Sequence, residues 1–429
     1  MLCVVPAFPP VNAADGHRVR MMLPYLAKSG WGATVLTVRP EDVAGVKDPE
    51  LEATVPAGTE IRRVRALPLG LTRRLGFGSL GLRAGFFLKQ EGDRLLGQGD
   101  YDAVYFSSTV FSTFPLGPKW EQRHRVPFFL DYQDPWWSSY HGAGRGQRPP
   151  GGWLKYGLGQ MISKRQEGRV LPKSAGVTCV SPRYVEMLRK RYPQMGREKF
   201  LELPFGAPEQ DAKLVGVRSE DRRVRGRERE EVWRYIGRGG PDMAAALRIY
   251  GEVLTNLKEK RSFRLELAGT SYATGSSAER TMAPVLGEFL PPGAVTESPD
   301  RIGYLESLRR LKGADRLVLF GSDDPAYTAS KLYNYVLARR PLLAICREES
   351  TVGKIVRETK AGEVITFGEH EVRLGGRIKI RQEWKQAMER WLAMDPAKEP
   401  GTDWQAFRDY TAERMTKKLC RFFDQRLDG

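Results

Sequence analysis

Residues 327–345 contain a polar turn, a helix pattern and a buried strand pattern, and the turn carries side chains that can bind a phosphate. The segment reads YTASKLYNYVLARRPLLAI, with Ser330 and Lys331 where the helix is predicted to begin. A hydroxyl, an ammonium and the free backbone N–H groups of a helix start can together hold an anion. The alternative is an ordinary unit of helix and strand with a capped helix start, and this segment on its own is compatible with both.

A glycine-rich turn with an arginine is the second candidate anion site. YIGRGGP, at residues 235–241, follows a predicted strand and precedes a predicted helix, so the amides of Gly237 and Gly239 and the guanidinium of Arg238 are candidate phosphate ligands. A tight strand-to-helix turn also needs glycine, which is the alternative explanation. Both segments follow strands of one predicted sheet, so together they predict a diphosphate site at the carboxyl edge of that sheet.

Two carboxylates and two tryptophans follow a predicted strand in the first half of the chain. In LDYQDPWW, at residues 130–137, Asp131 and Asp134 stand at the strand end, with Trp136 and Trp137 beside them. Carboxylates accept hydrogen bonds from sugar hydroxyl groups, and flat aromatic rings are surfaces on which sugars stack. The alternative is a turn at Asp134 and Pro135, with tryptophans that only pack against the core.

The loop NAADGHRVR, which follows the first predicted strand, contributes Asp15, Gly16 and His17. Ligands of open α/β sheets bind at the carboxyl ends of the strands, so this loop is expected to face a ligand. A histidine at a helix start is also compatible with a capping or surface role. Asp323 and Asp324 precede a proline, and we interpret them as a loop rather than as a metal site.

The order of apolar runs predicts two doubly wound α/β domains and a final helix. Predicted strands lie at residues 2–5, 32–38, 101–108, 127–134 and 176–181 in the first half, and at 232–237, 263–269, 315–321 and 342–346 in the second. A charged linker at residues 204–229 separates the two halves. We therefore expect an N-terminal domain at residues 1–205, a C-terminal domain at 206–402, and an amphipathic crossover helix within 403–429.

The chain has 429 residues and a formal net charge of +17, which calls for a polyanionic partner. Three classes of polyanionic partner are possible: nucleic acid, anionic lipid headgroups and phosphorylated small molecules. From Arg62 to Arg94 eight basic residues alternate with leucines and phenylalanines, a mixture that suits an anionic membrane surface. The alternative is a solvated loop and helix whose apolar residues belong to the core. Residues 218–234 mix arginine with acidic residues, which fits a solvated segment better than a nucleic-acid patch.

Several classes of protein are poorly supported. No apolar stretch approaches the roughly 20 residues of a membrane span, and residues 1–10 are too short and proline-broken for a signal peptide, so we expect a cytoplasmic protein that is at most peripheral at the inner membrane face. The four cysteines form no CxxC pair and are expected to be reduced and buried. Four histidines offer little material for a metal centre. The chain lacks a GKS or GKT Walker sequence and a full GxGxxG, which argues against a nucleoside triphosphatase or a dinucleotide enzyme.

Four stretches of the chain together resemble the family 4-like (group 1) glycosyltransferases of the GT-B fold, in particular the branch that builds bacterial polysaccharides. They are GHRVRMMLPYLAKSGWGATVLTV, SSTVFSTFPLGPKWEQRHRVPFFLDYQDPW, VTCVSPRYVEMLRKRYP with the following KFLELPFGAP, and YTASKLYNYVLARRPLLAI. DYQDPW and ASKLYNYV are the most specific parts. The resemblance covers most of the chain and is weakest at residues 142–168 and in the charged linker.

The resemblance implies two Rossmann-like domains that face a central cleft, with a C-terminal helix packing back across. It also implies a hexosyltransferase with a nucleotide-diphosphate sugar on the second domain, a glycan or lipid-linked acceptor on the first, no cofactor or catalytic metal, and retention of anomeric configuration. Arg238 and Lys331 would neutralise the diphosphate as the glycosyl bond breaks, and Asp134 would lie near the reacting sugar. The implied donor contacts are Gly237, Gly239, Tyr327, Ser330 and Asn334, and the acceptor contacts are Asp15, Gly16, His17, Asp131 and Trp136.

The chain departs from the family pattern at three positions. Asn334 stands where the family has a glutamate that accepts hydrogen bonds from ribose, and a neutral contact is roughly half as strong as a charge-assisted one. Ala14, Asp15 and Gly16 replace a Gly-Gly loop, and the usual lysine after the Gly/Arg turn is absent. These changes keep a second hypothesis open, a glycosyltransferase-like binding or scaffold protein without turnover. Nucleic-acid binding is a third hypothesis, which rests on charge alone.

Overall fold

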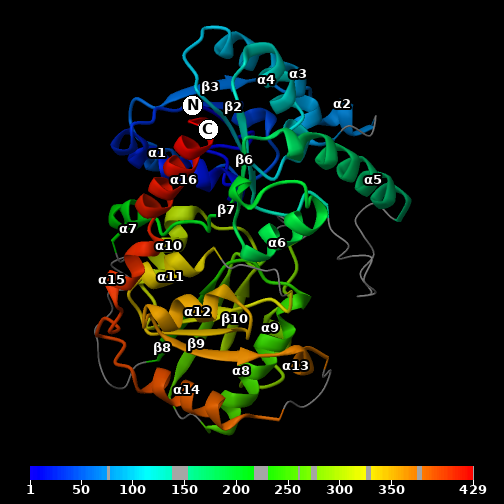
Figure 1. Cartoon of the computed structure of the whole chain (residues 1–429). Helices are drawn as coiled ribbons and strands as arrows, with labels where there is room; N and C mark the ends of the chain where they lie inside the picture. The colour runs from blue at the N-terminus through cyan, green and yellow to red at the C-terminus, as the bar shows by residue number, and fades with distance from the viewer. Residues whose placement is uncertain are drawn as a thin grey trace. The chain divides into compact units, whose positions relative to one another are not determined.

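The computed structural model describes residues 1–74, 78–137, 153–216, 230–258, 261–271, 278–324, 330–373 and 379–428 (Figure 1). The chain forms two compact units. The N-terminal unit comprises Met1–Phe205 and Ala412–Gly429, and the C-terminal unit comprises Gly206–Thr411. The last helix of the chain therefore belongs to the same unit as the first strand.

The N-terminal unit contains a parallel sheet of seven strands in the order β3-β2-β1-β4-β5-β6-β7. The strands are β1 (Leu2–Val4), β2 (Thr34–Val38), β3 (Glu60–Val64), β4 (Val104–Ser107), β5 (Phe128–Tyr132), β6 (Gly176–Cys179) and β7 (Phe200–Glu202). Every residue of the five central strands is buried, because helices cover both faces of a parallel sheet of this kind. This confirms a doubly wound α/β arrangement.

Helices connect the strands of this unit. They are α1 (His17–Leu26), α2 (Leu69–Arg74), α3 (Leu80–Leu96), α4 (Leu116–His124), α5 (Trp153–Val170), α6 (Pro182–Arg191) and the C-terminal α16 (Ala412–Leu427). Gly30 ends the first helical segment in the left-handed conformation, with φ at 76°. Ser79 and Ser181 cap α3 and α6 through their hydroxyl groups.

The C-terminal unit repeats the pattern with six parallel strands in the order β10-β9-β8-β11-β12-β13. The strands are β8 (Glu231–Ile236), β9 (Phe263–Ala268), β10 (Val295–Ser298), β11 (Arg316–Phe320), β12 (Leu342–Arg347) and β13 (Glu363–Phe367). The helices are α7 (Glu209–Leu214), α8 (Ala244–Asn256), α9 (Ala283–Leu286), α10 (Tyr304–Lys312), α11 (Leu332–Leu337), α12 (Thr351–Glu358), α13 (Glu369–Arg373), α14 (Gln382–Ala393) and α15 (Trp404–Phe407). Within the described residues, no helix combines the length and apolar character needed to cross a membrane.

Both sheets reverse their strand order at one point. The reversal lies between β1 and β4 in the first sheet and between β8 and β11 in the second. In sheets of this type the crevice outside the carboxyl ends of these strands is where ligands bind. Residues that directly follow β1, β4, β8 and β11 are therefore the ones to compare with the predicted sites.

The predicted continuous helix over residues 404–427 is interrupted. A short 3-10 turn at Arg408–Tyr410 follows α15, and α16 begins after Thr411, whose ψ of 155° is extended. The break lets α16 leave the C-terminal unit and pack on α1 of the N-terminal unit, to which α16 belongs. The expected C-terminal helix that packs back is thus present.

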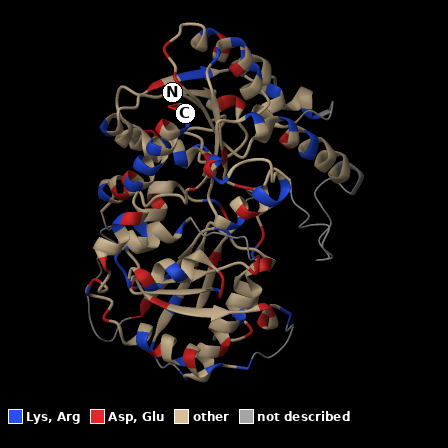
Figure 2. Cartoon of the chain, viewed as in Figure 1, with Lys and Arg blue, Asp and Glu red and all other residues tan. Residues whose placement is uncertain are grey.

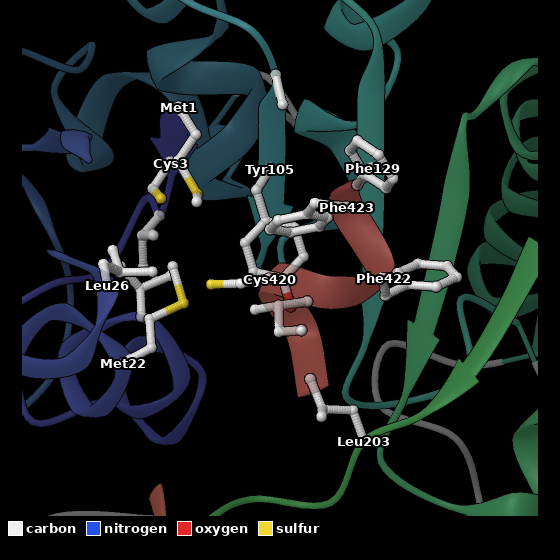
Figure 3. Close-up of a cluster of buried hydrophobic side chains, with 14 of the residues drawn as sticks. Met1, Cys3, Met22, Leu26, Tyr105, Phe129, Leu203, Cys420, Phe422 and Phe423 are labelled. Atoms are coloured by element: carbon white, nitrogen blue, oxygen red, sulfur yellow. The ribbon is translucent and has the colours of Figure 1, made fainter. Parts of the chain in front are cut away.

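Aromatic side chains attach α16 to the N-terminal sheet (Figure 3). The ring of Phe423 lies 4.5 Å from Phe129 and 5.3 Å from Tyr105, measured between centroids. Gly176 on β6 makes room for the neighbouring Phe422, because a Cβ at this position would come within 2.6 Å of the Phe422 ring. The helix therefore completes the core of this unit.

The four cysteines are free and buried, as the sequence predicted. Burial raises the pKa of the Cys3 thiol to about 12 and that of Cys346 to about 11. These thiols stay protonated at neutral pH and act as small apolar residues.

A tyrosine on α11 fixes the end of β8. The Tyr335 hydroxyl accepts a hydrogen bond of 2.7 Å from the Ile236 N–H and donates one of 3.0 Å to the Ile236 carbonyl. Both groups of Ile236 are thereby satisfied by a single side chain. The start of α11 and the turn after β8 are held together by this contact.

We predict that Phe423→Ala destabilises the N-terminal unit by about 3–5 kcal/mol, because it removes a fully buried aromatic ring. Urea unfolding followed by tryptophan fluorescence measures the loss, and Trp31, whose ring lies 5.5 Å from Phe423, reports on this site. Arg421→Ala, on the exposed face of the same helix, is the control and should change stability by less than about 0.5 kcal/mol. Equal effects of the two variants would contradict the docking of α16.

We predict that Tyr335→Phe costs about 1–3 kcal/mol, because two buried backbone groups of Ile236 lose their partner. The matched control is Tyr250→Phe, since the Tyr250 hydroxyl is buried and forms no hydrogen bond within the described part of the chain. This control should leave stability unchanged or slightly raised. Chemical denaturation of both variants tests the difference, and a loss of the same size for Tyr250→Phe would refute the assigned role of Tyr335.

Candidate functional site

The glycine turn after β8 packs against Lys331. Gly237 has a φ of 144°, in a region that favours glycine. A Cβ at Gly237 would lie 2.8 Å from Cδ and 3.0 Å from Nζ of Lys331. Glycine is thus required here both for conformation and for space, and the predicted Gly/Arg turn and Ser/Lys turn do meet at the carboxyl edge of one sheet, on either side of its reversal point.

The Lys331 ammonium lies over an aromatic ring. Its Nζ is 4.2 Å from the centroid of the Tyr235 ring and hydrogen-bonds the Tyr235 hydroxyl, which in turn donates to the Arg238 carbonyl. Burial lowers the pKa of Lys331 well below its usual value, the positive charge of Arg238 lowers it further, and Asp242 partly opposes this. A bound anion would reverse the shift, because it would stabilise the charged ammonium.

A carboxylate orients Arg238. Its guanidinium makes two hydrogen bonds to Asp242, of 3.0 Å and 2.6 Å, in the bidentate geometry that fixes an arginine most firmly. Burial alone would raise the pKa of Asp242, but the hydrogen bonds and charge of Arg238 outweigh it and lower the pKa. Asp242 was not predicted as a site residue, although an aspartate directly after a Gly/Arg turn was a usable signal.

The Gly237 and Gly239 amides, which were predicted to bind phosphate, have backbone partners in the structure. The Gly237 N–H donates to the Ala268 carbonyl at 3.0 Å, and the Gly239 N–H donates to the Thr270 carbonyl at 2.7 Å. These amides attach the turn to β9 and the residues after it. The candidate ligands for an anion here are therefore the side chains of Arg238 and Lys331. Gly239 still has a spatial role, because a Cβ there would lie 3.0 Å from the Thr281 hydroxyl oxygen.

The remaining predicted donor contacts lie around α11. Ser330 is exposed in the turn before the helix, and Lys331 is the residue that caps it, so the helix begins slightly later than predicted. The side-chain oxygen of Asn334 is buried and accepts no hydrogen bond within the described part of the chain. Tyr327 lies outside the described residues.

Asp131 lies at the centre of a polar network inside the N-terminal unit. Its carboxylate is fully buried and accepts hydrogen bonds from Arg18, Ser107, Gln133 and Thr178. The side chain is saturated by protein groups. Direct contact between Asp131 and an acceptor is therefore not supported, and its role is to hold the polar residues at the ends of β4, β5 and β6.

Arg18 carries this network to the end of the unit. Besides Asp131, its guanidinium donates to the carbonyls of Leu203 and Pro204, at 2.7 Å and 3.1 Å, and it lies 4.7 Å from the Phe205 ring. Arg18 lies in the loop segment that was expected to face a ligand, but its buried pairing with Asp131 was not predicted.

Asp15 lies where the first sheet reverses its order. Its carboxylate accepts a hydrogen bond of 2.8 Å from the Ser108 hydroxyl, after β4, and a weaker one from the Thr109 N–H. Burial raises the pKa of Asp15, although these hydrogen bonds oppose the shift. A Cβ on Gly16 would come within 2.6 Å of the Ala7 carbonyl oxygen, so this glycine permits a close approach of two loops. Next to it, the His17 ring accepts a hydrogen bond of 3.3 Å from Arg20.

Asp134 and Trp136 have opposite environments. Asp134 is exposed in the bend after β5. Trp136 is buried; its ring stacks on Phe111 at 5.6 Å and packs edge-on against Phe114. The stacking of Trp136 on a protein ring supports the core-packing alternative over a sugar platform, whereas Trp137 lies beside Arg191, whose guanidinium is 3.6 Å from the ring centroid.

Known proteins resemble this chain in sequence, over its N-terminal unit, and in structure, over its whole length. Residues 16–206 match the family model of the glycosyl transferase 4-like domain. No curated protein gives a significant sequence match. Sucrose-phosphate synthase from Thermosynechococcus elongatus aligns with a TM-score of 0.59 at 15% identity, over 99% of this chain and 98% of that chain.

Two further solved structures are similar over their whole length. Anabaena Alr3699/HepE in complex with UDP and glucose aligns with a TM-score of 0.61 at 13% identity, over 99% of this chain and 100% of that chain. A UDP-forming trehalose-phosphate synthase from Burkholderia xenovorans gives 0.61 at 10% identity, over 99% and 98%. Likeness at these identities establishes the fold. With its two parallel sheets the chain has the GT-B fold of these structures, and its N-terminal unit is similar to the glycosyl transferase 4-like domain.

Proposed function

We propose that the protein transfers a hexosyl group from a nucleotide-diphosphate sugar to a glycan or lipid-linked acceptor in polysaccharide synthesis. The observation that carries the proposal is the convergence of Lys331 and Arg238 at the Gly237 turn, on the edge where sheets of this type bind ligands. Two cations and one carboxylate, Asp242, leave an excess of positive charge there. A diphosphate has the charge and the size to occupy this position.

In the proposed reaction the bond between the anomeric carbon and the β-phosphate oxygen breaks, and a bond to the acceptor hydroxyl oxygen forms. The hydroxyl proton passes to the departing nucleoside diphosphate or to water. Lys331 and Arg238 stabilise the negative charge that grows on the leaving group. With these two cations, we propose a reaction without a catalytic metal and with retention of configuration, as the family resemblance implies.

The partners are proposed from the neighbours and from the N-terminal unit. Alr3699/HepE is a structure with UDP and glucose, so UDP-glucose is the first donor to test. Asp15, with a raised pKa beside Ser108, is suited to bind hydroxyl groups of an acceptor, and exposed Asp134 is our candidate near the reacting sugar. Gly16 and His17 flank this position.

Asn334 is compatible with a sugar-transferring enzyme and also with a binding protein that has no turnover. Its unsatisfied side-chain oxygen can accept a hydrogen bond from a ribose hydroxyl, if a side-chain movement exposes it. The absence of a negative charge favours a binding or scaffold protein without turnover as the second candidate. Transfer or hydrolysis of any sugar nucleotide by the purified protein would exclude this second candidate.

We predict that Lys331→Ala weakens binding of UDP-glucose by about 10- to 100-fold, the loss expected for one charge-assisted hydrogen bond of ~1.5–3 kcal/mol. Lys331→Arg keeps the charge and should retain part of the affinity. Isothermal titration calorimetry measures both. The control is Lys354→Ala, which removes an exposed lysine of α12 in the same unit and should leave the affinity unchanged. Unchanged binding by Lys331→Ala would show that the diphosphate lies elsewhere.

We also predict that donor affinity falls as pH rises. Because the pKa of free Lys331 is lowered and a bound diphosphate raises it, binding above the free pKa takes up a proton. Affinity should be highest where Lys331 is already charged and should decline by at most about tenfold per pH unit above its free pKa. Titrations from about pH 6 to pH 8.5, in two buffers of different ionisation enthalpy, measure the proton uptake. Lys331→Arg, which stays charged, should abolish the uptake; uptake that persists in this variant would assign the effect to another group.

A further inference from the structure

Exposed apolar side chains gather on one part of the N-terminal unit. Eight large hydrophobic residues are exposed within the described part of the chain, and four of them lie in only 20 residues: Leu67 (47% exposed), Leu71 (62%), Leu82 (54%) and Phe86 (71%). We refer to these four residues, with Arg65 and Arg73, as the α2–α3 surface. A soluble protein rarely exposes such side chains together unless another surface covers them.

A buried arginine joins the two halves of this surface. The Leu67 N–H donates to the Arg83 carbonyl at 3.1 Å, and Nε of Arg83 donates back to the Leu67 carbonyl at 2.8 Å. Arg83 also donates to the Asp42 carbonyl, and its side chain is only 3% exposed. The prediction that Arg83 belongs to a basic surface is therefore wrong. Arg83 is buried and holds the loop of Leu67 against α3.

The outward direction of Leu82 and Phe86 follows from how α3 packs. They are four residues apart and lie on the same side of the helix. A different side of the helix is close to other elements, since a Cβ on Gly81 would come within 2.2 Å of the Ser112 hydroxyl and one on Gly92 within 2.2 Å of the Trp120 ring. The glycine side of α3 is thus pressed onto the unit, which leaves Leu82 and Phe86 facing outward.

The charges around this surface are positive. No aspartate or glutamate occurs between Ile61 and Gln90. Arg65 is exposed and lies 4.7 Å above the Phe87 ring, and exposed Arg73 forms no ion pair within the described residues.

Other basic residues nearby are neutralised. Arg62, Lys89 and Arg94 each pair with an acidic residue of their own strand or helix. In Figure 2 basic and acidic residues are interspersed over both units, rather than gathered into one basic tract as an extended nucleic-acid site would be. Unneutralised arginines therefore coincide with exposed apolar side chains at the α2–α3 surface.

We propose that the α2–α3 surface docks on an anionic lipid bilayer. Leucine and phenylalanine side chains enter the boundary between headgroups and acyl chains, and Arg65 and Arg73 contact lipid phosphates. Charge complementarity selects this partner. A second copy of the chain would bring two positive surfaces together, which like charges oppose. The proposal goes beyond sugar transfer and uses none of the residues assigned to it.

Sedimentation of the full chain with vesicles tests the docking. We expect binding to vesicles of phosphatidylcholine with about one third phosphatidylglycerol, and much weaker binding to phosphatidylcholine alone, since each arginine near an anionic surface contributes about fivefold in affinity. Added salt should weaken the binding by screening the arginines.

Two double variants separate the contributions. L82S/F86S should lower vesicle affinity at least about tenfold through lost apolar insertion, and R65Q/R73Q should lower it mainly on anionic vesicles. Matched controls are Leu214→Ser, an exposed leucine of the C-terminal unit, and Arg94→Gln, a paired arginine at the other end of α3. Both controls should bind vesicles as the unmodified chain does. Thermal unfolding and UDP-glucose affinity of all four variants should match those of the unmodified chain, so that failure of docking and failure of the donor site are told apart.

Three results would overturn the proposal. They are equal binding to neutral and anionic vesicles, vesicle binding that L82S/F86S leaves unchanged, and self-association in lipid-free buffer that this variant abolishes. The last result, measured by analytical ultracentrifugation, would assign the surface to a second copy of the chain.

Discussion

The close approach of Lys331 to Gly237 is the contact on which the candidate donor site depends. The lysine can lie over the Tyr235 ring only because residue 237 has no side chain, since a Cβ there would come within 3.0 Å of its nitrogen. Tyr335 fixes the same two elements by satisfying both backbone groups of Ile236. The ammonium is therefore positioned before any ligand arrives, which is the arrangement that electrostatic stabilisation of a leaving group requires.

The carboxyl edges of the two sheets carry different electrostatics. In the N-terminal unit the Asp131 carboxylate is paired with Arg18 and saturated by neutral donors, so this network has no charge to offer a ligand. In the C-terminal unit Arg238 and Lys331 have one carboxylate, Asp242, between them. Burial lowers the pKa of the lysine, and the positive charge of Arg238 lowers it further. An anion is stabilised more at the second position than at the first, which is the physical argument for assigning the diphosphate to the C-terminal unit and a neutral, hydroxyl-rich acceptor to the N-terminal unit.

The sequence predicted correctly those elements in which every residue has the same environment. The central strands are buried on both faces and read as continuous apolar runs, so they were predicted nearly in place. The four edge strands, β3, β7, β10 and β13, were not predicted, because each is only partly buried and carries polar side chains. The glycine turn was recognised, but the use of its amides was not, since backbone hydrogen bonds to β9 depend on the neighbouring strand. Asp131 and Trp136 were read as ligand contacts for the same reason: a pattern gives their position at a strand end, but not the partners that surround them.

Asn334, in place of the glutamate of the family pattern, is a change in charge that offsets a second departure from that pattern. The family resemblance also places a lysine after the Gly/Arg turn, and this chain has none. Removing one cation and one anion together leaves the net charge of the proposed diphosphate site unchanged, whereas removing the lysine alone would weaken the site for a ligand that carries two negative charges. Asp242 adds to this constraint, because its carboxylate already neutralises part of Arg238. A glutamate at position 334 would be a second negative charge opposed by only two cations, so a neutral side chain is the choice that keeps this site attractive to an anion.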